Sequence, residues 1–271
     1  MYIVLSDKVQ PLKKRLVLFF VLSLIILLTL ISGTAEAEKT AFESDYSSSR
    51  LVPIYKVQRD DNKIALTIDG AWGSQETEAL LNLFAEEKIP VSFFFAGIWL
   101  NDNPDLVNKI ITSGHDIYNH SYTHAHFNKL SRDKIVEELN RTEELINSFY
   151  SEERETRLFR PPYGEYNKLV ISTAREMGYQ VVQWSLDSHD WMDPGEEYIL
   201  ERIRTKIDSG DILLFHNNSN NIVQILSKVI SELKEDYQFV RIKDLIYNNN
   251  YQISSLTGLQ YKIKKEENNE N

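Results

Sequence analysis

Histidine is unevenly distributed in this 271-residue chain. Four of its six histidines fall within the twelve residues 115–126, and the other two are His189 and His216. Imidazole is the commonest neutral metal ligand and the usual acid–base group near neutral pH. His120 and His124 are four residues apart, so on a helical turn both rings would lie on one face and could share an ion. The spacing predicts a metal site here, with a chance pair of histidines as the competing interpretation.

Short apolar runs alternate with helical patterns from Tyr55 onward, and the strands and helices that this pattern predicts must position the histidines. Strands joined through helices in this way are typically parallel and belong to an α/β fold. The alternating or continuous apolar runs predict seven strands at residues 63–68, 91–96, 115–118, 158–160, 180–185, 211–215 and 239–241. Helical periodicity predicts helices at residues 75–88, 104–112, 131–149, 168–177, 198–207 and 222–233. Ser74 and Ser131 are the expected N-terminal caps of the first and third of these helices.

Side chains capable of chemistry follow most of these strands. Taken singly, each has an ordinary explanation, such as a turn cap for an aspartate, a surface ion pair for an arginine or a packed strand-end histidine. Because the carboxyl ends of parallel strands meet at one edge, their convergence there is stronger evidence for a site. The residues concerned are Asp69, His120, His124, Arg160, Asp187, Asp190, Trp191 and His216.

The first 54 residues differ in character from the rest. Residues 1–15 form a basic flank expected in the cytoplasm, and residues 16–32 form an apolar run. The run predicts a membrane anchor, or the apolar core of a signal peptide cleaved after Ala37. Residues 33–54 are expected to be a linker, residues 55–247 the folded domain and residues 248–271 a polar, frayed tail. The protein is therefore expected outside the cytoplasm, anchored to the membrane or secreted.

Composition narrows the possible partners. The net charge of −10 and a pI near 5.2 argue against binding to nucleic acid, which needs a basic surface. The absence of cysteine excludes disulfides, thiolate metal sites and a cysteine nucleophile, so any metal must be held by nitrogen and oxygen. We expect a monomer.

Five short motifs, in order, resemble those of the polysaccharide deacetylase family, the NodB-like carbohydrate esterases of family 4. The resemblance covers roughly residues 55–247 and implies a distorted (β/α)7 barrel. The motifs are residues 65–69 (ALTID), 119–124 (NHSYTH), 160–164 (RPPYG), 187–191 (DSHDW) and 214–216 (LFH).

The resemblance implies hydrolysis of an N-acetyl group on an amino sugar, assisted by a divalent metal, expected to be Zn²⁺, on His120 and His124. Asp69 is then the general base, oriented by Arg160, and His216 the general acid. Asp190, or alternatively Asp187, would pair with His216. Tyr163 would help to hold the oxyanion through its backbone N–H, and Trp191 and Leu214 would line the acetate pocket. Trp72 lies in a motif loop, where its ring could stack on a sugar, although a core position is the ordinary expectation for tryptophan.

Gly70 departs from the family pattern. The family has a second aspartate here, the third metal ligand, and a variant subgroup lacks it. An ungapped alignment keeps Asp69 as the base and leaves two histidine ligands. A shift of one residue would instead make Asp69 a ligand and leave no base, and strand register does not permit both. His126 and Asn119 are nearby candidates to complete a weak site.

We therefore expect a membrane-tethered N-deacetylase acting on an N-acetylated envelope polysaccharide, peptidoglycan before chitin-like glycans. The main alternative is a glycan-binding pseudoenzyme of the envelope or spore that has lost catalysis, which Gly70 favours. A purely structural envelope protein is the third interpretation, and it leaves the catalytic candidates without a use.

Overall fold

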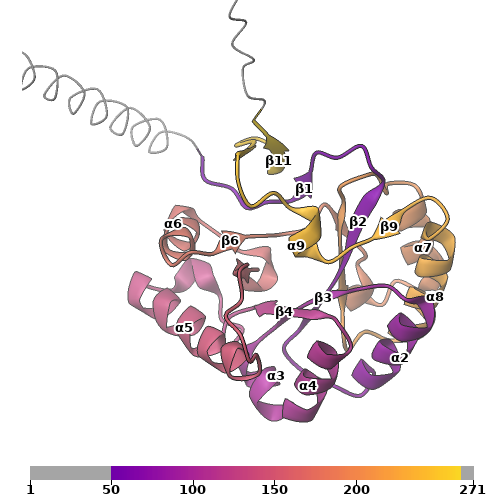
Figure 1. Cartoon of the computed structure of the whole chain (residues 1–271), viewed down its shortest axis with the longest axis horizontal. Helices are drawn as coiled ribbons and strands as arrows, with labels where there is room; N and C mark the ends of the chain where they lie inside the picture. Colours follow the sequence, from indigo (N-terminus) through magenta and orange to yellow (C-terminus); the bar gives the residue numbers. More distant parts are fainter. Residues whose placement is uncertain (1–49, 264–271) are drawn as a thin grey trace, which may run out of the picture. The chain divides into compact units, whose positions relative to one another are not determined.

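The computed structural model describes residues 50–263 (Figure 1). The predicted basic flank, the apolar run and most of the linker lie outside this range, as do residues 264–271. Within residues 50–263 there is no helix with the length and apolar character needed to span a membrane.

The alternating pattern predicted parallel strands, and these form a curled half-barrel, which is more open than the distorted (β/α)7 barrel that the resemblance implied. The strands follow the order β6 (Gln180–Val181), β5 (Leu158–Phe159), β4 (Asp116–Asn119), β3 (Ser92–Phe95), β2 (Lys63–Gly70), β8 (Ile212–His216) and β7 (Leu186–Asp187). A further strand, β9 (Gln238–Phe239), pairs with the start of β2. The long central strand β2 therefore lies between β3 and β8, and its carboxyl end carries Asp69.

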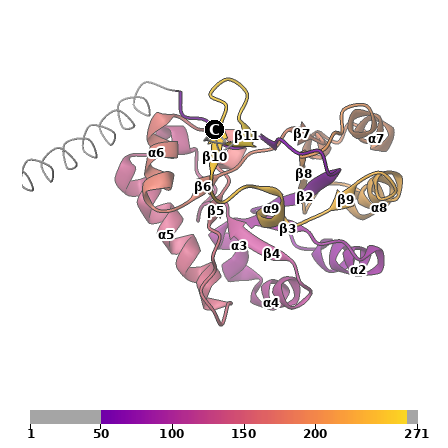
Figure 2. The same cartoon turned by 45° about the horizontal axis from the view of Figure 1, so that its top comes forward.

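Helices surround the outer face of the sheet (Figures 1 and 2). One apolar layer packs outward-facing side chains of β2, β3 and β8 against α2 (Thr77–Glu87), α4 (Pro104–Thr112), α7 (Glu196–Arg204) and α8 (Ile222–Leu233). Another packs β5 and β6 against α5 (Arg132–Ser148) and α6 (Lys168–Glu176). The short helix α9 (Ile242–Leu245) packs with inward-facing residues such as Ala65 and Phe94. Interior and exterior faces of the strands are thus both buried, which explains their continuous apolar runs.

Several elements differ from the sequence-based expectations. The predicted cap Ser131 does accept a hydrogen bond from the Lys134 N–H, but helix α2 begins after Glu76 rather than at a capping Ser74. Helix α3 (Gly97–Asp102) was not predicted. The frayed tail expected from Asn248 was wrong for its first part, because β10 (Tyr251–Ile253) and β11 (Leu259–Lys262) form an antiparallel pair there.

The N-terminal stretch of the described chain closes the opening in the barrel. Ile54 bridges to Val182 just after β6. A few residues later, in β1 (Lys56–Val57), the Val57 N–H donates to the Gly210 carbonyl just before β8. β1 also pairs in parallel with β11. This stretch links the two arms of the curled sheet.

Candidate active site

The histidine pair lies in an irregular loop after β4, not on the helical turn that the spacing suggested. Ser121 and His124 have φ values of 67° and 57°, in the left-handed region that a helix excludes. The two imidazole rings of His120 and His124 nevertheless meet edge to face, with centroids 4.9 Å apart. The predicted proximity is therefore present, but a shaped loop produces it.

Hydrogen bonds to Glu138 and Asn119 hold this loop. Glu138 Oε2 on α5 accepts from the backbone N–H groups of Tyr122 and Thr123 at 2.9 and 2.8 Å. The buried amide oxygen of Asn119 accepts from the Ser121 N–H at 3.0 Å. Sequence reasoning missed Glu138, because nothing distinguishes it from other acidic residues on the helix. It also offered Asn119 as a possible ligand, whereas its amide is used within the loop and in a bond to the Leu139 carbonyl.

The pKa of each imidazole in the pair is lowered, which favours the neutral form. His120 Nδ1 is 2.8 Å from the Arg160 carbonyl, and its Nε2 lies 3.7 Å from Asp69 Oδ2. Burial lowers the pKa of His120, although the Asp69 carboxylate opposes this effect. Burial, together with the neighbouring His120, lowers the pKa of His124 to about 3. Neutral imidazole is the form that binds a metal.

Asp69 is paired with a fully buried arginine. Arg160 Nη1 donates to Asp69 Oδ1 at 2.6 Å and to the Thr67 hydroxyl at 2.9 Å. Nη2 donates to the Gln183 carbonyl, and the guanidinium lies 4.0 Å from the centroid of the Phe94 ring inside the barrel. One carboxylate oxygen is thus fixed by Arg160, and the other is directed toward His120.

His216 forms a second pair at the end of β8. Its Nδ1 is 2.8 Å from Asp190 Oδ1, and its backbone N–H donates to Asp190 Oδ2 at 2.7 Å. Burial lowers the pKa of His216, but hydrogen bonding and charge from Asp190, with added charge from Asp69 and Asp187, raise it above the usual value overall. Asp187 Oδ1 instead accepts from the His189 N–H, so the structure places Asp190 rather than Asp187 on His216.

The residues present fit two positions of a metal site but not a third. The two neutral imidazoles are suitable donors, and His124 Nδ1 is buried without a hydrogen-bond partner. Over residues 50–263, however, no group of three or more histidine, cysteine, aspartate or glutamate side chains is arranged to hold an ion. His126 does not complete the pair, because its Nδ1 is 3.1 Å from Glu165 Oε1 and its ring stacks on Tyr163.

Exposed aromatic rings lie beside the histidine pair. Trp72 and Tyr163 each meet the ring of His124 edge-on, with centroid distances of 4.8 and 4.5 Å. Both are more than half exposed, as is Trp191 next to Asp190. Tyr163 has a φ of 59°, in the left-handed region. Leu214 is buried on β8, on the same face of the strand as His216.

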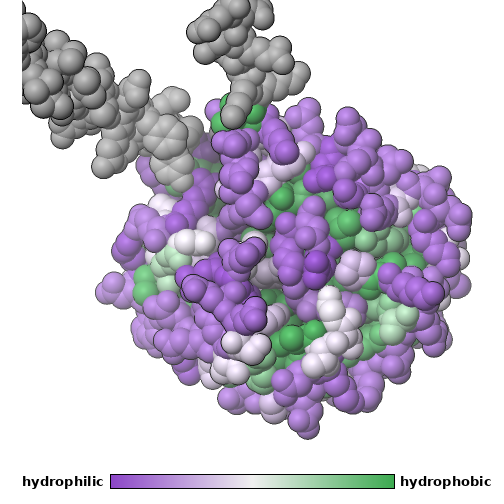
Figure 3. Space-filling model, viewed as in Figure 1, coloured by the Kyte–Doolittle hydropathy of each residue, from purple (hydrophilic) through white to green (hydrophobic). Residues whose placement is uncertain are grey.

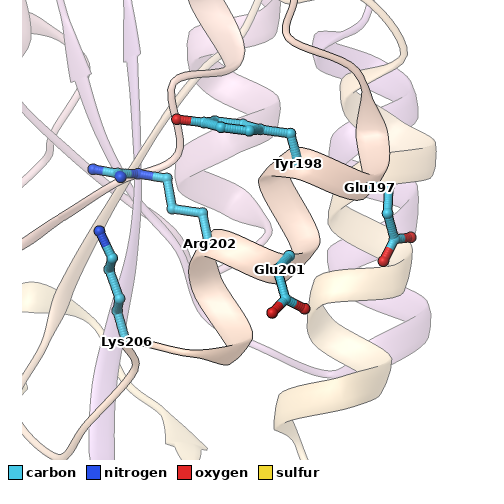
Figure 4. Close-up of a pocket in the computed structure, with 5 residues that line it drawn as sticks. All are labelled: Glu197, Tyr198, Glu201, Arg202 and Lys206. Atoms are coloured by element: carbon cyan, nitrogen blue, oxygen red, sulfur yellow. The ribbon is translucent and has the colours of Figure 1, made fainter.

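A pocket of roughly 460 Å³ lies elsewhere, on helix α7 (Figure 4). It contains none of the predicted site residues, and its two cations are matched by two carboxylates. Its lining residues are Glu197, Tyr198, Glu201, Arg202 and Lys206. Only its edge reaches the site, where Arg202 Nε donates to the Asp187 carbonyl at 2.6 Å.

The face of the molecule seen in Figure 3 is mostly hydrophilic, with apolar patches between the hydrophilic side chains.

Comparison with known proteins gives consistent matches. Residues 56–182 match the family model described as polysaccharide deacetylase. The chain is 33% identical over 198 residues to the peptidoglycan-N-acetylglucosamine deacetylase of Bacillus cereus, covering 71% of this chain and 92% of that protein. It is also 33% identical over 183 residues to the Bacillus subtilis protein YlxY, covering 68% of this chain and only 56% of that protein's length.

Among solved structures, a similar one is a pseudoenzyme of carbohydrate esterase family 4 from Bacillus anthracis. It is 29% identical, with a TM-score of 0.67 and coverage of 72% of this chain and 68% of that chain. A mutant of that pseudoenzyme, described as having restored enzymatic activity, is equally similar, with a TM-score of 0.67 and 30% identity.

Proposed function

Because the chain belongs to the polysaccharide deacetylase family, we propose that it hydrolyses the N-acetyl groups of an envelope polysaccharide. Peptidoglycan is the first candidate substrate and a chitin-like glycan the second. The observation that carries this proposal is the presence of two complete ion pairs, Asp69–Arg160 and Asp190–His216, at the same edge of the sheet as the histidine pair. A protein that only bound glycans would have no need of both pairs.

The two pairs have the properties that acid–base catalysis requires. Asp69, held by Arg160, would take a proton from the attacking water. His216, with its pKa raised by Asp190, would carry a proton to the leaving amine nitrogen as the C–N bond breaks. The products are acetate and a free amino sugar.

A divalent cation, such as Zn²⁺, would be held by His120 and His124, and it would supply Lewis-acid polarisation of the acetyl carbonyl. Two protein ligands make a weaker site than three. We propose that Trp72 stacks on a sugar ring beside the cation, while Tyr163 and Trp191 border the acetyl group together with Leu214.

Acetate release by the purified full-length chain tests this proposal, with peptidoglycan and an N-acetylglucosamine pentamer as substrates. Asp69→Asn and His216→Ala should each reduce the rate by about 10² to 10⁴-fold. Matched controls are Asp193→Asn and His189→Ala, which alter exposed or part-exposed residues outside both pairs and should leave the rate within a factor of about two. Full activity in both test variants would overturn the assigned roles.

A glycan-binding pseudoenzyme is the second candidate. Gly70, which offers no carboxylate, favours it, and so does the similarity to the Bacillus anthracis pseudoenzyme. This candidate predicts that the wild-type chain binds the N-acetylglucosamine pentamer without releasing acetate, even with added zinc. A binding titration with the pentamer, run beside the acetate-release assay, therefore separates the two functions.

The cellular location also belongs to the proposal. The basic flank before the apolar run at residues 16–32 supports export and anchoring, which would place the catalytic domain outside the cytoplasm. The proposal also takes this domain to act as a monomer. Fractionation of cells producing the full-length chain, with protease added from outside, tests the location.

A further inference from the structure

Gly70 stands where the family pattern that the five motifs resemble has a second aspartate, so the direction in which a side chain at this position would point is informative. Neighbouring residues of a strand face opposite sides. Thr67 and Asp69 face the barrel interior, where both contact Arg160. Ile68 faces outward, into the apolar layer beneath the helices. The alternation places Gly70 on the side of Ile68, opposite to the side from which Asp69 approaches His120.

The space beside Gly70 is already filled. A Cβ atom added there would lie 2.3 Å from Cε1 of Phe95 and 2.6 Å from Oδ1 of Asn217. Separations this short are far inside van der Waals contact between carbon atoms. A side chain at position 70 therefore requires Phe95 or Asn217 to move.

Neither neighbour is free to move. Phe95 is fully buried and stacks on Trp99, with ring centroids 3.9 Å apart and planes 16° from parallel. The indole N–H of Trp99 donates to the Gly73 carbonyl at 2.6 Å. Asn217, also fully buried, donates to the same carbonyl at 2.6 Å. The loop after Asp69 and the two neighbours are thus locked together by one set of contacts.

From these contacts we infer that packing requires glycine at position 70: Phe95 and Asn217 fill the space that a side chain would need, on the side of the strand that faces away from His120. The inference rests on the proposed function in taking His120 and His124 as the ligands of a divalent cation. Restoring the missing carboxylate by Gly70→Asp would not add a third ligand, because its side chain meets Phe95 and faces away from His120. A shorter residue at position 95 would make room for the side chain without turning it toward the cation.

Zinc affinity and thermal stability of the full-length chain test this inference. Gly70→Ala should lower the melting temperature by several degrees and leave zinc affinity unchanged. Gly70→Asp should lower the melting temperature at least as much, with zinc affinity within about threefold of wild type. The double variant Gly70→Asp/Phe95→Val has room for the new side chain, and its zinc affinity should also stay within about threefold of wild type, because the carboxylate faces away from His120.

A double-mutant cycle keeps the test valid even where an aspartate variant fails to fold. In a Phe95→Val background the loss caused by Gly70→Ala should shrink by at least half. In a Phe84→Val background it should persist, because Phe84 is buried in the same apolar layer but is not among the atoms nearest to a Cβ at position 70. Gly70→Asp with wild-type melting temperature and tenfold tighter zinc binding would overturn the inference, as would equal losses in both backgrounds. Acetate release is not part of this readout, so an inactive wild-type chain would refute the proposed function and leave this inference standing.

Discussion

Two parts of the candidate site, named here for their proposed roles, are built in different ways. The acid–base half consists of the pairs Asp69–Arg160 and Asp190–His216, and the metal half consists of His120 and His124. In the acid–base half, Asp69 and Asp190 are both buried, and each has an ionisable partner: the fully buried Arg160 in the barrel interior and the partly exposed His216 at the end of β8. In the metal half, two histidines whose pKa values are lowered project from a loop, and the space beside Gly70 is packed with apolar and amide groups. Buried charge is costly unless it is paired, whereas neutral imidazole needs no counter-charge. The fold therefore depends on the first half and much less on the second.

The largest expected difference between the halves is in stability. Arg160→Met leaves Asp69 buried without its partner and should cost about 3–5 kcal/mol in the free energy of unfolding, together with all measurable acetate release. His124→Ala should change unfolding by less than about 1 kcal/mol and reduce zinc affinity instead. Urea unfolding and zinc titration measure both quantities. Equal stability losses in the two variants would remove the contrast.

The acid–base half should also be sensitive to pH through His216. Asp190→Asn removes the carboxylate that raises the pKa of His216, so the alkaline limb of the kcat profile should move to lower pH. A shift of about one unit corresponds to about tenfold lower kcat on that limb. Asp187→Asn is the control, because Asp187 contributes charge but no hydrogen bond to His216, and its shift should be much smaller. An unchanged profile in Asp190→Asn would refute the pairing's catalytic role.

A smaller effect should come from the edge of the metal half. His126 stacks on Tyr163 with centroids 4.3 Å apart and planes 15° from parallel, and Tyr163 has a left-handed backbone. His126→Ala should reduce kcat by about three- to tenfold by releasing Tyr163. His126→Phe keeps a flat ring and should retain most of the activity. If the two variants lose activity equally, the stacking does not position Tyr163.

The smallest expected effect concerns two histidines: His216, which is ion-paired with a carboxylate, and the buried His115, which has no ion pair within residues 50–263. His115 has only Asp116 as a charged neighbour, and burial lowers its pKa to about 4. Its contribution to stability is present above pH 6.5 and is lost as the pH falls toward 4, on the order of 1 kcal/mol at pH 5. His216, which faces Asp190, Asp69 and Asp187, has a raised pKa. Its contribution is present below pH 6.5 and is lost as the pH rises through the folded-state value.

Urea midpoints at pH 5 and pH 8 check these opposite signs. On going from pH 8 to pH 5, His115→Gln should lose less stability than wild type, and His216→Gln should lose more. The same direction of change in both variants would contradict the distinction between paired and unpaired histidines.

Local patterns in the sequence were sufficient to predict much of the fold. Helices 104–112 and 222–233 have the predicted bounds, because proline, glycine and amphipathic spacing act locally. Helix α3, β10 and β11 were missed because short elements of mixed composition depend on tertiary partners.

The residues of the candidate site were also predictable, but their local geometry was not. Strand ends indicated which residues converge, since parallel topology fixes where carboxyl ends meet. The left-handed backbone at His124, the role of Glu138 and the ring of Phe95 beside Gly70 depend on side chains distant in sequence, which no spacing reveals.

The stretch that closes the barrel opening has a consequence for how the protein folds. Ile54, Lys56 and Val57 precede every other strand within residues 50–263, yet their partners Val182, Gly210 and Leu259 come much later in the chain. Closing such long loops carries an entropy cost before the contacts form, and pairings of this kind slow folding. During synthesis this stretch must wait unpaired until most of the chain has been made. Closure of the barrel is therefore expected to be a late step, and substitutions at Ile54 should chiefly accelerate unfolding while leaving the folding rate almost unchanged.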